Sequence, residues 1–351
     1  MRSRRALGAA LVALLVLGAC SGDDDGGTTA APDGSPTPPA PTCPISGLEP
    51  EAPADLDRPA VAVKVENTTA AYPLSGLDKA EVVYEELVEG GITRFMAIYH
   101  CTDTKKVGPV RSARLVDPAI MTPITRILGD AGGNDIVLKA LDKANIISID
   151  ENKAGNAMRR VYRPDVSSEH TLYASTPALR KIGQKSFKKP PPDGIFEYGD
   201  ALAGKEVKGV DMVFSGSTTV SYKWTGGKWH RSDHGEALTM ESGVPIAVDN
   251  VIIEQHEVNY SSGVYDVAGN QSVEISDVTG SGKAILFRDG VMTEGRWLRK
   301  TVESAVQYRT KDGETMVLDP GTTWIELLPD SKGALKGSYS VTKAGGGKKN
   351  D

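Results

Sequence analysis

The chain has 351 residues, 39% of them hydrophobic and 25% charged, which suits one or two globular domains and excludes a collagen-like or wholly disordered chain. Its 46 acidic and 40 basic residues give a formal charge of −6, so nothing in the overall charge favours nucleic acid, and we expect no nucleic-acid partner. The one stretch able to enter a membrane, residues 6–19, is shorter than the ~20 residues of a spanning helix, which excludes a multispanning transporter or channel.

The first residues predict export. Residues 1–19 begin with arginines, continue with the apolar run and end in Leu17-Gly18-Ala19, the pattern of a secretory signal peptide. Together with Cys20 this ending resembles a lipobox, which implies that Cys20 is diacylated and becomes the new N-terminus. Two acyl chains suffice for stable anchoring, so we expect the protein on the outer face of the cell membrane. The alternative is an ordinary signal peptide with a chance cysteine.

The segment after the lipid-bearing cysteine predicts a tether. Residues 21–42 contain no aromatic or large aliphatic side chain, so residues 20–42 are predicted to stay disordered, and so is the tail at 338–351. With Cys20 lipidated, Cys43 and Cys101 remain. An even pair outside the cytoplasm predicts a disulfide between them, with two unpaired thiols as the alternative.

The first predicted domain covers residues 43–195 and ends at a Lys/Pro/Gly-rich stretch, residues 185–194. Two of its apolar runs flank Glu89-Gly90-Gly91, which predicts a hairpin because glycine readily adopts positive φ. Mixed helices and strands indicate a layered α/β domain. Strands are predicted at 61–65, 82–88, 92–100 and 146–149, and helices at 118–128, 135–143 and 177–184.

The second predicted domain covers residues 205–330. Short β-rich runs separated by turn residues indicate a mainly antiparallel β domain, so the fold class predicted for the whole chain is α+β. The runs are at 212–214, 219–224, 246–254, 272–278, 284–288 and 323–328.

A metal site is one hypothesis for the segment around residue 230. His230, Asp233, His234 and Glu236 have side chains that suit zinc. Neighbouring side chains of a strand point to opposite faces, however, so these residues do not all converge unless a turn gathers them. We prefer a solvated turn, and we expect no metal and no other cofactor.

Charged residues interrupt the predicted hairpin. Glu85, Glu89 and Arg94 lie among apolar strand residues, where a buried charge without a partner would cost several kcal/mol. Downstream, Arg111 and Arg114 have guanidinium groups suited to pairing with these glutamates or to binding an anionic ligand. The sequence leaves open whether the cluster is a structural network or a binding site.

Several sequence blocks resemble the YerB-like lipoproteins. The most specific are Gly-Gly-Ile-Thr-Arg at 90–94 and Gly-Pro-Val-Arg-Ser-Ala-Arg at 108–114. The resemblance implies a bacterial lipoprotein with an N-terminal α/β layered domain, a separate C-terminal domain and no assigned biochemical function. The chain departs from the family at Ser168-Glu169-His170, where Ala-Pro-His is common. Further blocks continue the resemblance in order from about residue 60 to 329, at 75–77, 80–84, 131–133, 170–173, 222–224, 234, 250–252 and 321–325.

We therefore interpret the chain as a lipid-anchored, extracytoplasmic binding or regulatory protein of the cell envelope. Its expected partners are the membrane, through the lipid, and a cell-wall component or an envelope protein. The alternatives are a wall-acting hydrolase, with Glu85 or Glu89 as acid/base and His170 assisting, and a simple spacer. No catalytic residue is assigned, because no nucleophile stands beside a base. The candidate ligand-binding residues are Glu85, Arg94, Arg111, Arg114, His170 and Tyr173.

Overall fold

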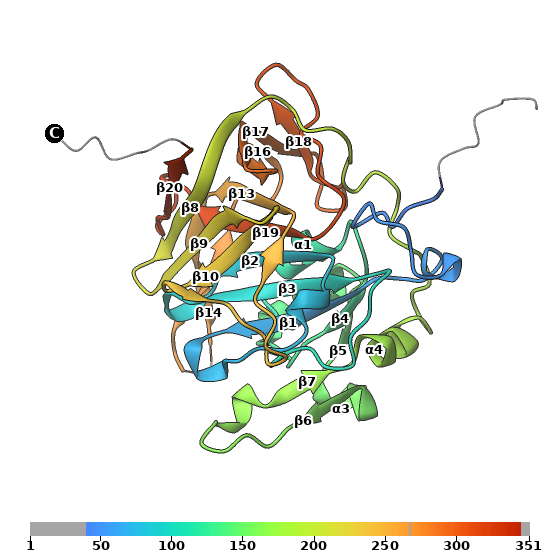
Figure 1. The fold of residues 1–351 in the computed structure, drawn as a ribbon. Helices are drawn as coiled ribbons and strands as arrows, with labels where there is room; N and C mark the ends of the chain where they lie inside the picture. The colour runs from blue at the N-terminus through green and yellow to red at the C-terminus, as the bar shows by residue number, and fades with distance from the viewer. Residues whose placement is uncertain (1–39, 267, 345–351) are drawn as a thin grey trace, which may run out of the picture. The chain divides into compact units, whose positions relative to one another are not determined.

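Strand pairing dominates the structure, a computed structural model that describes residues 40–266 and 268–344. One mixed sheet of 16 strands runs through both halves of the sequence (Figure 1). At its centre lie, in order, β13 (Asn250–His256), β19 (Thr323–Pro329), β2 (Val82–Leu87), β3 (Thr93–Tyr99) and β1 (Val61–Asn67). The predicted signal peptide and Cys20 lie outside the described residues. None of the helices described is long and apolar enough to cross a membrane.

The N-terminal strands confirm the predicted hairpin. β2 and β3 pair antiparallel, and Gly90 in the turn has a φ of 73°, which glycine adopts without strain. β4 and β5 extend the sheet beyond β1 by parallel pairing. The strands of this half are β1 (Val61–Asn67), β2 (Val82–Leu87), β3 (Thr93–Tyr99), β4 (Ile127–Gly129), β5 (Ile147–Ile149) and the separate pair β6 (Met158–Arg160) and β7 (Leu172–Ala174).

The helices are short. The prediction at 135–143 matches α2, whereas the helix predicted over 118–128 is wrong beyond residue 121, because the chain turns through Pro123 into β4. The α-helices are α1 (Asp117–Met121), α2 (Asp135–Lys143), α3 (Glu151–Ala154) and α4 (Thr176–Gly183). Single 3-10 turns occur at Pro53–Asp55, Thr69–Ala71, Leu77–Lys79, Glu89–Gly91, Gly155–Ala157 and Ser168–His170.

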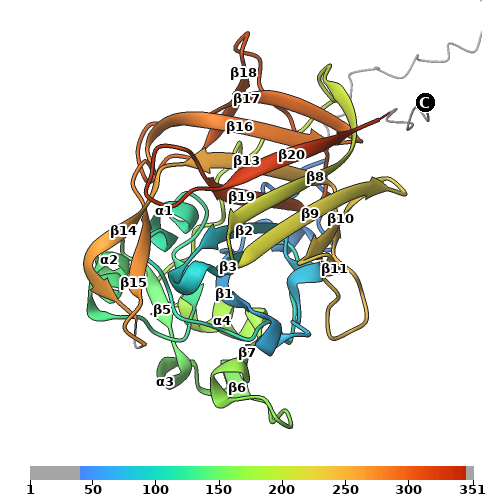
Figure 2. The same cartoon turned by 90° about the vertical axis from the view of Figure 1, so that its left-hand side faces the viewer.

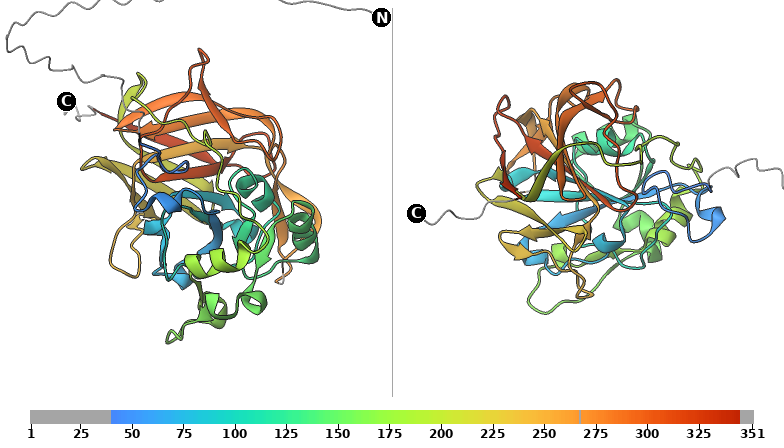
Figure 3. Two further views of the ribbon diagram at one scale, coloured as in Figure 1. Left: turned by 90° about the vertical axis from the view of Figure 1, so that its right-hand side faces the viewer. Right: turned by 45° about the horizontal axis from the view of Figure 1, so that its top comes forward.

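The C-terminal half is built of strands, as predicted. In Figure 3 the helices, drawn in green, lie with the N-terminal strands, and the orange and red part consists of strands and loops. β20 pairs with β8, so the predicted disordered tail does not include residues 338–343. The strands are β8 (Lys205–Ser215), β9 (Thr218–Thr225), β10 (Lys228–Asp233), β11 (Glu236–Ala237), β12 (Ala247–Val248), β13 (Asn250–His256), β14 (Val258–Tyr265), β15 (Gln271–Ile275), β16 (Gly280–Arg288), β17 (Val291–Arg299), β18 (Gln307–Thr310), β19 (Thr323–Pro329) and β20 (Ser338–Lys343).

Strand β19 joins the two halves into one sheet. It pairs parallel to β13 on one side and parallel to β2 on the other, and all seven of its residues are buried. The predicted α+β class with a layered N-terminal α/β domain is therefore wrong: the fold is mostly β. The physical reason is that strands of the C-terminal half extend the N-terminal sheet and also cover part of it: β19 pairs with β2, and the guanidinium of Arg231 on β10 lies over the ring of Phe95 on β3, 5.2 Å from its centroid.

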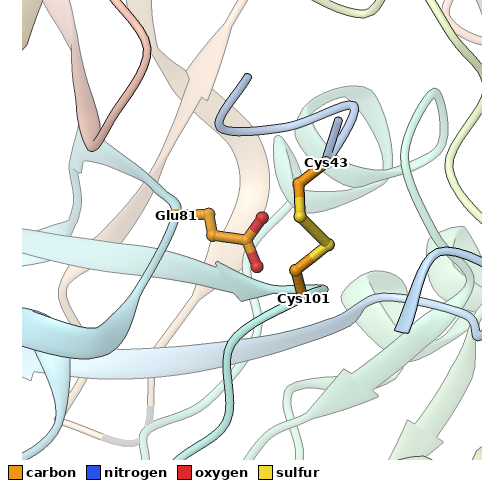
Figure 4. Close-up of side chains that lie close together, drawn as sticks. All are labelled: Cys43, Glu81 and Cys101. Atoms are coloured by element: carbon orange, nitrogen blue, oxygen red, sulfur yellow. A yellow bond between two sulfur atoms is a disulfide. The ribbon is translucent and has the colours of Figure 1, made fainter. Parts of the chain in front are cut away.

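A disulfide connects the start of the described chain to the end of β3. Cys43 and Cys101 are bonded, with Cα atoms 6.1 Å apart, and Figure 4 shows the carboxylate of Glu81 beside them. Glu81 accepts hydrogen bonds from the backbone N–H groups of His100, at 2.7 Å, and of Thr102, at 2.9 Å. The carboxylate thus fixes the chain that follows β3, next to the covalent link.

We expect the Cys43→Ser, Cys101→Ser double variant to lose about 4 kcal/mol of unfolding free energy, because the bond closes a loop of 58 residues in the unfolded chain. Urea unfolding of the full chain measures this loss. Wild-type protein under reducing agent is the matched control and is expected to behave like the variant. Equal midpoints for the oxidised wild type and the variant would contradict the prediction.

Candidate functional site

Side-chain alternation divides the charges of the central strands between two faces of the sheet. Arg94 of β3 lies directly opposite Glu66 of β1 and Glu86 of β2, and Lys64 shares this face. Glu85 points to the other face. The charged residues of the hairpin therefore belong to two separate clusters.

A cleft of about 600 Å³ opens at the end of the face that carries Arg94. It brings together Arg94, Arg111 and Arg114, three of the predicted ligand-binding residues. We call it the arginine cleft. Its lining residues are Glu89, Arg94, Arg111, Ser112, Arg114, Ala131, Gly133, Asn134, Glu169, Tyr265 and Asp266.

Arg94 is the least compensated charge of the arginine cleft. The residue is only 6% exposed, and Nη1 donates to the carbonyl of Ser112 at 2.9 Å, but Nε has no hydrogen-bond partner among the described residues. Burial, reinforced by the neighbouring charges of Arg114 and Arg111, lowers the pKa of Arg94 to about 9. Nη2 also forms no hydrogen bond within the described part of the chain, so this nitrogen of the Arg94 guanidinium is left for a ligand.

Arg114 is held by the protein. Its Nε lies 2.7 Å and its Nη2 2.5 Å from Oε2 of Glu89, and its Nη1 donates to the carbonyl of Ala113 at 2.9 Å. Oε1 of Glu89 accepts from the hydroxyl of Ser272 at 2.7 Å. Burial opposes ionisation of Glu89, but Arg114 and Ser272 hold its pKa below the usual value. Arg114 and Glu89 thus line the cleft as a pair whose charges compensate each other.

Arg111 connects the cleft to His170. Its Nε lies 3.5 Å from Oε2 of Glu66, and its Nη1 donates to the carbonyl of Glu169 at 3.0 Å. The same Glu66 oxygen lies 2.7 Å from Nδ1 of His170. His170 therefore supports the cleft from behind through Glu66 and is not among the residues that line it.

Lys64 was missed by the sequence reasoning. It is fully buried, 2.6 Å from Oδ1 of Asp117, and also pairs with Glu86. Burial lowers its pKa to about 8, with Arg94 and Arg114 acting in the same direction. Because Glu86 is paired with Lys64, its carboxylate forms no ion pair with Arg94. A lysine inside the apolar run of β1 was the available signal.

The remaining missed residues come from distant parts of the chain. Gly133 and Asn134 precede α2, whose first turn is capped by Asn134, which accepts from the Val137 N–H at 2.9 Å. Tyr265 belongs to the β14–β15 hairpin, which lies beside α2 in Figure 2. The sequence offered no signal for this approach, because 131 residues separate Asn134 from Tyr265.

Glu85 and Tyr173 do not line the arginine cleft. Glu85 is fully buried on the opposite face, where it accepts from Asn67 at 3.1 Å and lies 2.7 Å from Nη2 of Arg231. The hydroxyl of Tyr173 accepts from Arg163 at 3.1 Å. The candidate residues thus divide into a cleft, a supporting histidine and separate structural contacts.

The described structure does not bring together the residues that the hydrolase hypothesis or the metal hypothesis requires. Glu85 and Glu89 lie in different clusters, and His170 is bonded to Glu66 instead of to either of them. Asp233 is buried against Arg231 of the same strand, with Oδ1 2.7 Å from Nη2. Among the residues described, the three side chains close enough to share a metal ion are Cys43, Glu81 and Cys101, and there the sulfurs are bonded to each other.

Comparisons with known proteins find relatives along most of the chain. Residues 45–189 match "Protein of unknown function (DUF3048) N-terminal domain", and residues 210–325 match the corresponding C-terminal domain. The "Putative lipoprotein YerB" of Bacillus subtilis is 31% identical over 297 residues, covering 82% of this chain and 86% of YerB. The crystal structure of YerB from Bacillus subtilis is similar, with a TM-score of 0.69 at 27% identity, covering 85% of this chain and 99% of that chain.

Proposed function

Because the chain belongs to the family of YerB-like proteins with DUF3048 domains, we propose that it is a lipid-anchored protein of the cell envelope that binds an anionic ligand in the arginine cleft. Membership confirms the resemblance predicted from residues 90–94 and 108–114. The lipoprotein name of the relative and the lipobox ending at Cys20 support the anchor. The cleft supports the binding role.

The observation that carries the proposal is the incomplete compensation of Arg94. Its two acidic cross-strand neighbours are engaged elsewhere, Glu66 with His170 and Glu86 with Lys64. Leaving a buried charge without a partner is costly, and a bound anion would compensate it with charge-assisted hydrogen bonds. Arg111, which is partly exposed beside Arg94, adds a second guanidinium for the same ligand.

Inorganic phosphate is the simplest probe of this site. We expect the detergent-solubilised full chain to bind phosphate in calorimetric titrations, and we expect Arg94→Met to weaken that binding at least tenfold, because a charge-assisted hydrogen bond is worth about 1.5–3 kcal/mol. Arg296→Met is the matched control: it removes the same charge from an exposed position on β17, outside the cleft. Undiminished binding by Arg94→Met would refute the proposed site.

The anchor is tested separately. We expect Cys20→Ala to release the protein from the membrane fraction or to leave it unprocessed, because no thiol remains to accept the lipid. Fractionation and intact-mass analysis report both results. Ser21→Ala, which changes the neighbouring residue and keeps the thiol, is expected to stay processed and membrane-bound. Unchanged mass and retention in the Cys20→Ala variant would end the lipoprotein proposal.

A further inference from the structure

We propose that the ligand of the arginine cleft is a sugar phosphate, with its phosphate between Arg94 and Arg111 and its sugar ring against the side chain of Tyr265. The inference rests on the proposed function and adds the chemical class of the ligand. In this arrangement the β14–β15 hairpin of the C-terminal half is the element that selects among anions.

The cleft suits a ligand larger than a bare anion. A volume of about 600 Å³ lies within the usual range of small-molecule sites, which is 300–1,000 Å³. The arginines occupy one part of the lining, and Tyr265, from a different sheet, contributes another. A ligand that fills this space needs a charged group and an uncharged body.

The charged end favours phosphate. A guanidinium group can donate two parallel hydrogen bonds to the oxygens of one phosphate. Arg94 and Arg111 present two guanidinium groups to the cleft from different segments of the chain. Gly133 and Asn134 add the N-terminal end of the nine-residue helix α2, where backbone N–H groups and the helix dipole favour anions. The independent sign of a ligand remains the Arg94 side chain, which is only 6% exposed, lines the cleft and forms no ion pair among the described residues.

The uncharged part of the site is Tyr265. Tyr265 lines the cleft and is 53% exposed, so its ring is not buried in the protein core. One hydrogen bond links its backbone to the start of α2: Asn134 Nδ2 donates to the carbonyl of Tyr265 at 3.4 Å. An aromatic face of this kind packs against the flat, C–H-bearing side of a sugar ring, and the phenolic hydroxyl remains for the sugar hydroxyls.

The hairpin is docked on both sides of the cleft. Ser272 of β15 donates to Glu89, the carboxylate that holds Arg114, while the carbonyl of Tyr265 on β14 accepts from Asn134, the N-cap residue of α2. Asp266, the other hairpin residue in the lining, forms no ion pair with Arg94 or Arg111 among the described residues: its Oδ1 accepts from the N–H groups of Ala268, at 2.9 Å, and Asn270, at 2.8 Å, and its charge acts on Arg114, which Glu89 already holds. The hairpin therefore adds a ring-binding surface without pairing with the two arginines assigned to the phosphate.

The test compares three ligands with the detergent-solubilised full chain: inorganic phosphate, glycerol 3-phosphate, which has no ring, and glucose 1-phosphate. We expect glucose 1-phosphate to bind about tenfold more tightly than the other two, the scale of a single aromatic stacking contact. Tyr265→Ala should remove this advantage and leave phosphate binding unchanged. Tyr260→Ala is the matched control, because Tyr260 is 51% exposed on the same strand and does not line the cleft.

The outcomes separate the two proposals. If phosphate binds and Arg94→Met abolishes binding, but the wild type does not prefer glucose 1-phosphate or Tyr265→Ala keeps the preference, the sugar phosphate inference is wrong and the anion site stands. If none of the three ligands binds the wild type, both proposals fail. Equal losses in the Tyr265→Ala and Tyr260→Ala variants would indicate damage to the hairpin and would also overturn the role of Tyr265.

Discussion

Replacing Arg231 by methionine is expected to lower the free energy of unfolding by about 3–5 kcal/mol, the largest effect of any single substitution considered for this chain. Arg231 is fully buried on β10. Its Nη2 lies 2.7 Å from both Glu85 and Asp233, and its Nη1 lies 3.1 Å from Glu326. Methionine would leave these three buried carboxyl groups without their shared cation.

The matched control is Glu326→Gln. Burial, followed by the nearby Glu85 carboxylate, raises the pKa of Glu326 well above its usual value, so folding favours the protonated, neutral form of this carboxyl. A glutamine keeps the acceptor that receives the Tyr222 hydroxyl at 2.6 Å and Nη1 of Arg231. We expect this variant to be at least as stable as the wild type at neutral pH.

The pH dependence of stability follows from the same shift. The folded protein keeps the Glu326 proton at pH values where the unfolded chain has lost it, so this group lowers stability as pH rises above the usual glutamate pKa. Glu326→Gln removes that contribution, and its stability is expected to fall less between pH 4 and 8 than that of the wild type. Urea unfolding of both proteins across this pH range measures the fall in the free energy of unfolding. Identical profiles would contradict the assigned protonation, and a mild Arg231→Met variant would contradict the role of Arg231.

Local patterns predicted the elements better than their assembly. The hairpin of β2 and β3 follows from two apolar runs around Gly90, and α2 from its amphipathic pattern. Neither pattern tells which strand lies next to β2 on its other side. That neighbour is β19, about 240 residues later, and parallel pairing over such a distance leaves no local signal. The prediction of a separate N-terminal α/β layer was wrong for this reason.

The candidate site shows the same limit. The need to compensate buried charges grouped Arg94, Arg111 and Arg114, which occupy neighbouring blocks of the sequence and line one cleft in the structure. The same reasoning placed Glu85 with them, although alternation along β2 turns it to the opposite face, towards Arg231 of the C-terminal half. Tyr265 was not predictable, because the hairpin reaches the cleft through tertiary packing alone.

Arg94→Met is expected to raise the free energy of unfolding by about 1–2 kcal/mol while it weakens anion binding, the combination typical of a binding site that is strained when empty. Since burial holds the pKa of Arg94 in the folded protein at about 9, below its value in the unfolded chain, the cost is fully present below pH 9 and declines as pH rises above it. Methionine preserves much of the stem and removes the buried charge.

Arg114→Met is the matched comparison, because Arg114 is paired with Glu89 in the same cleft and its loss strands a largely buried carboxylate. We expect it to destabilise the protein. Thermal melts at pH 7 with and without phosphate separate the two arginines: phosphate should stabilise the wild type by about 2.7 kcal/mol at 100 times the dissociation constant and leave Arg94→Met nearly unchanged. If Arg94→Met melts as low as Arg114→Met, Arg94 belongs to a closed structural network, and the empty cleft is not held ready for an anion.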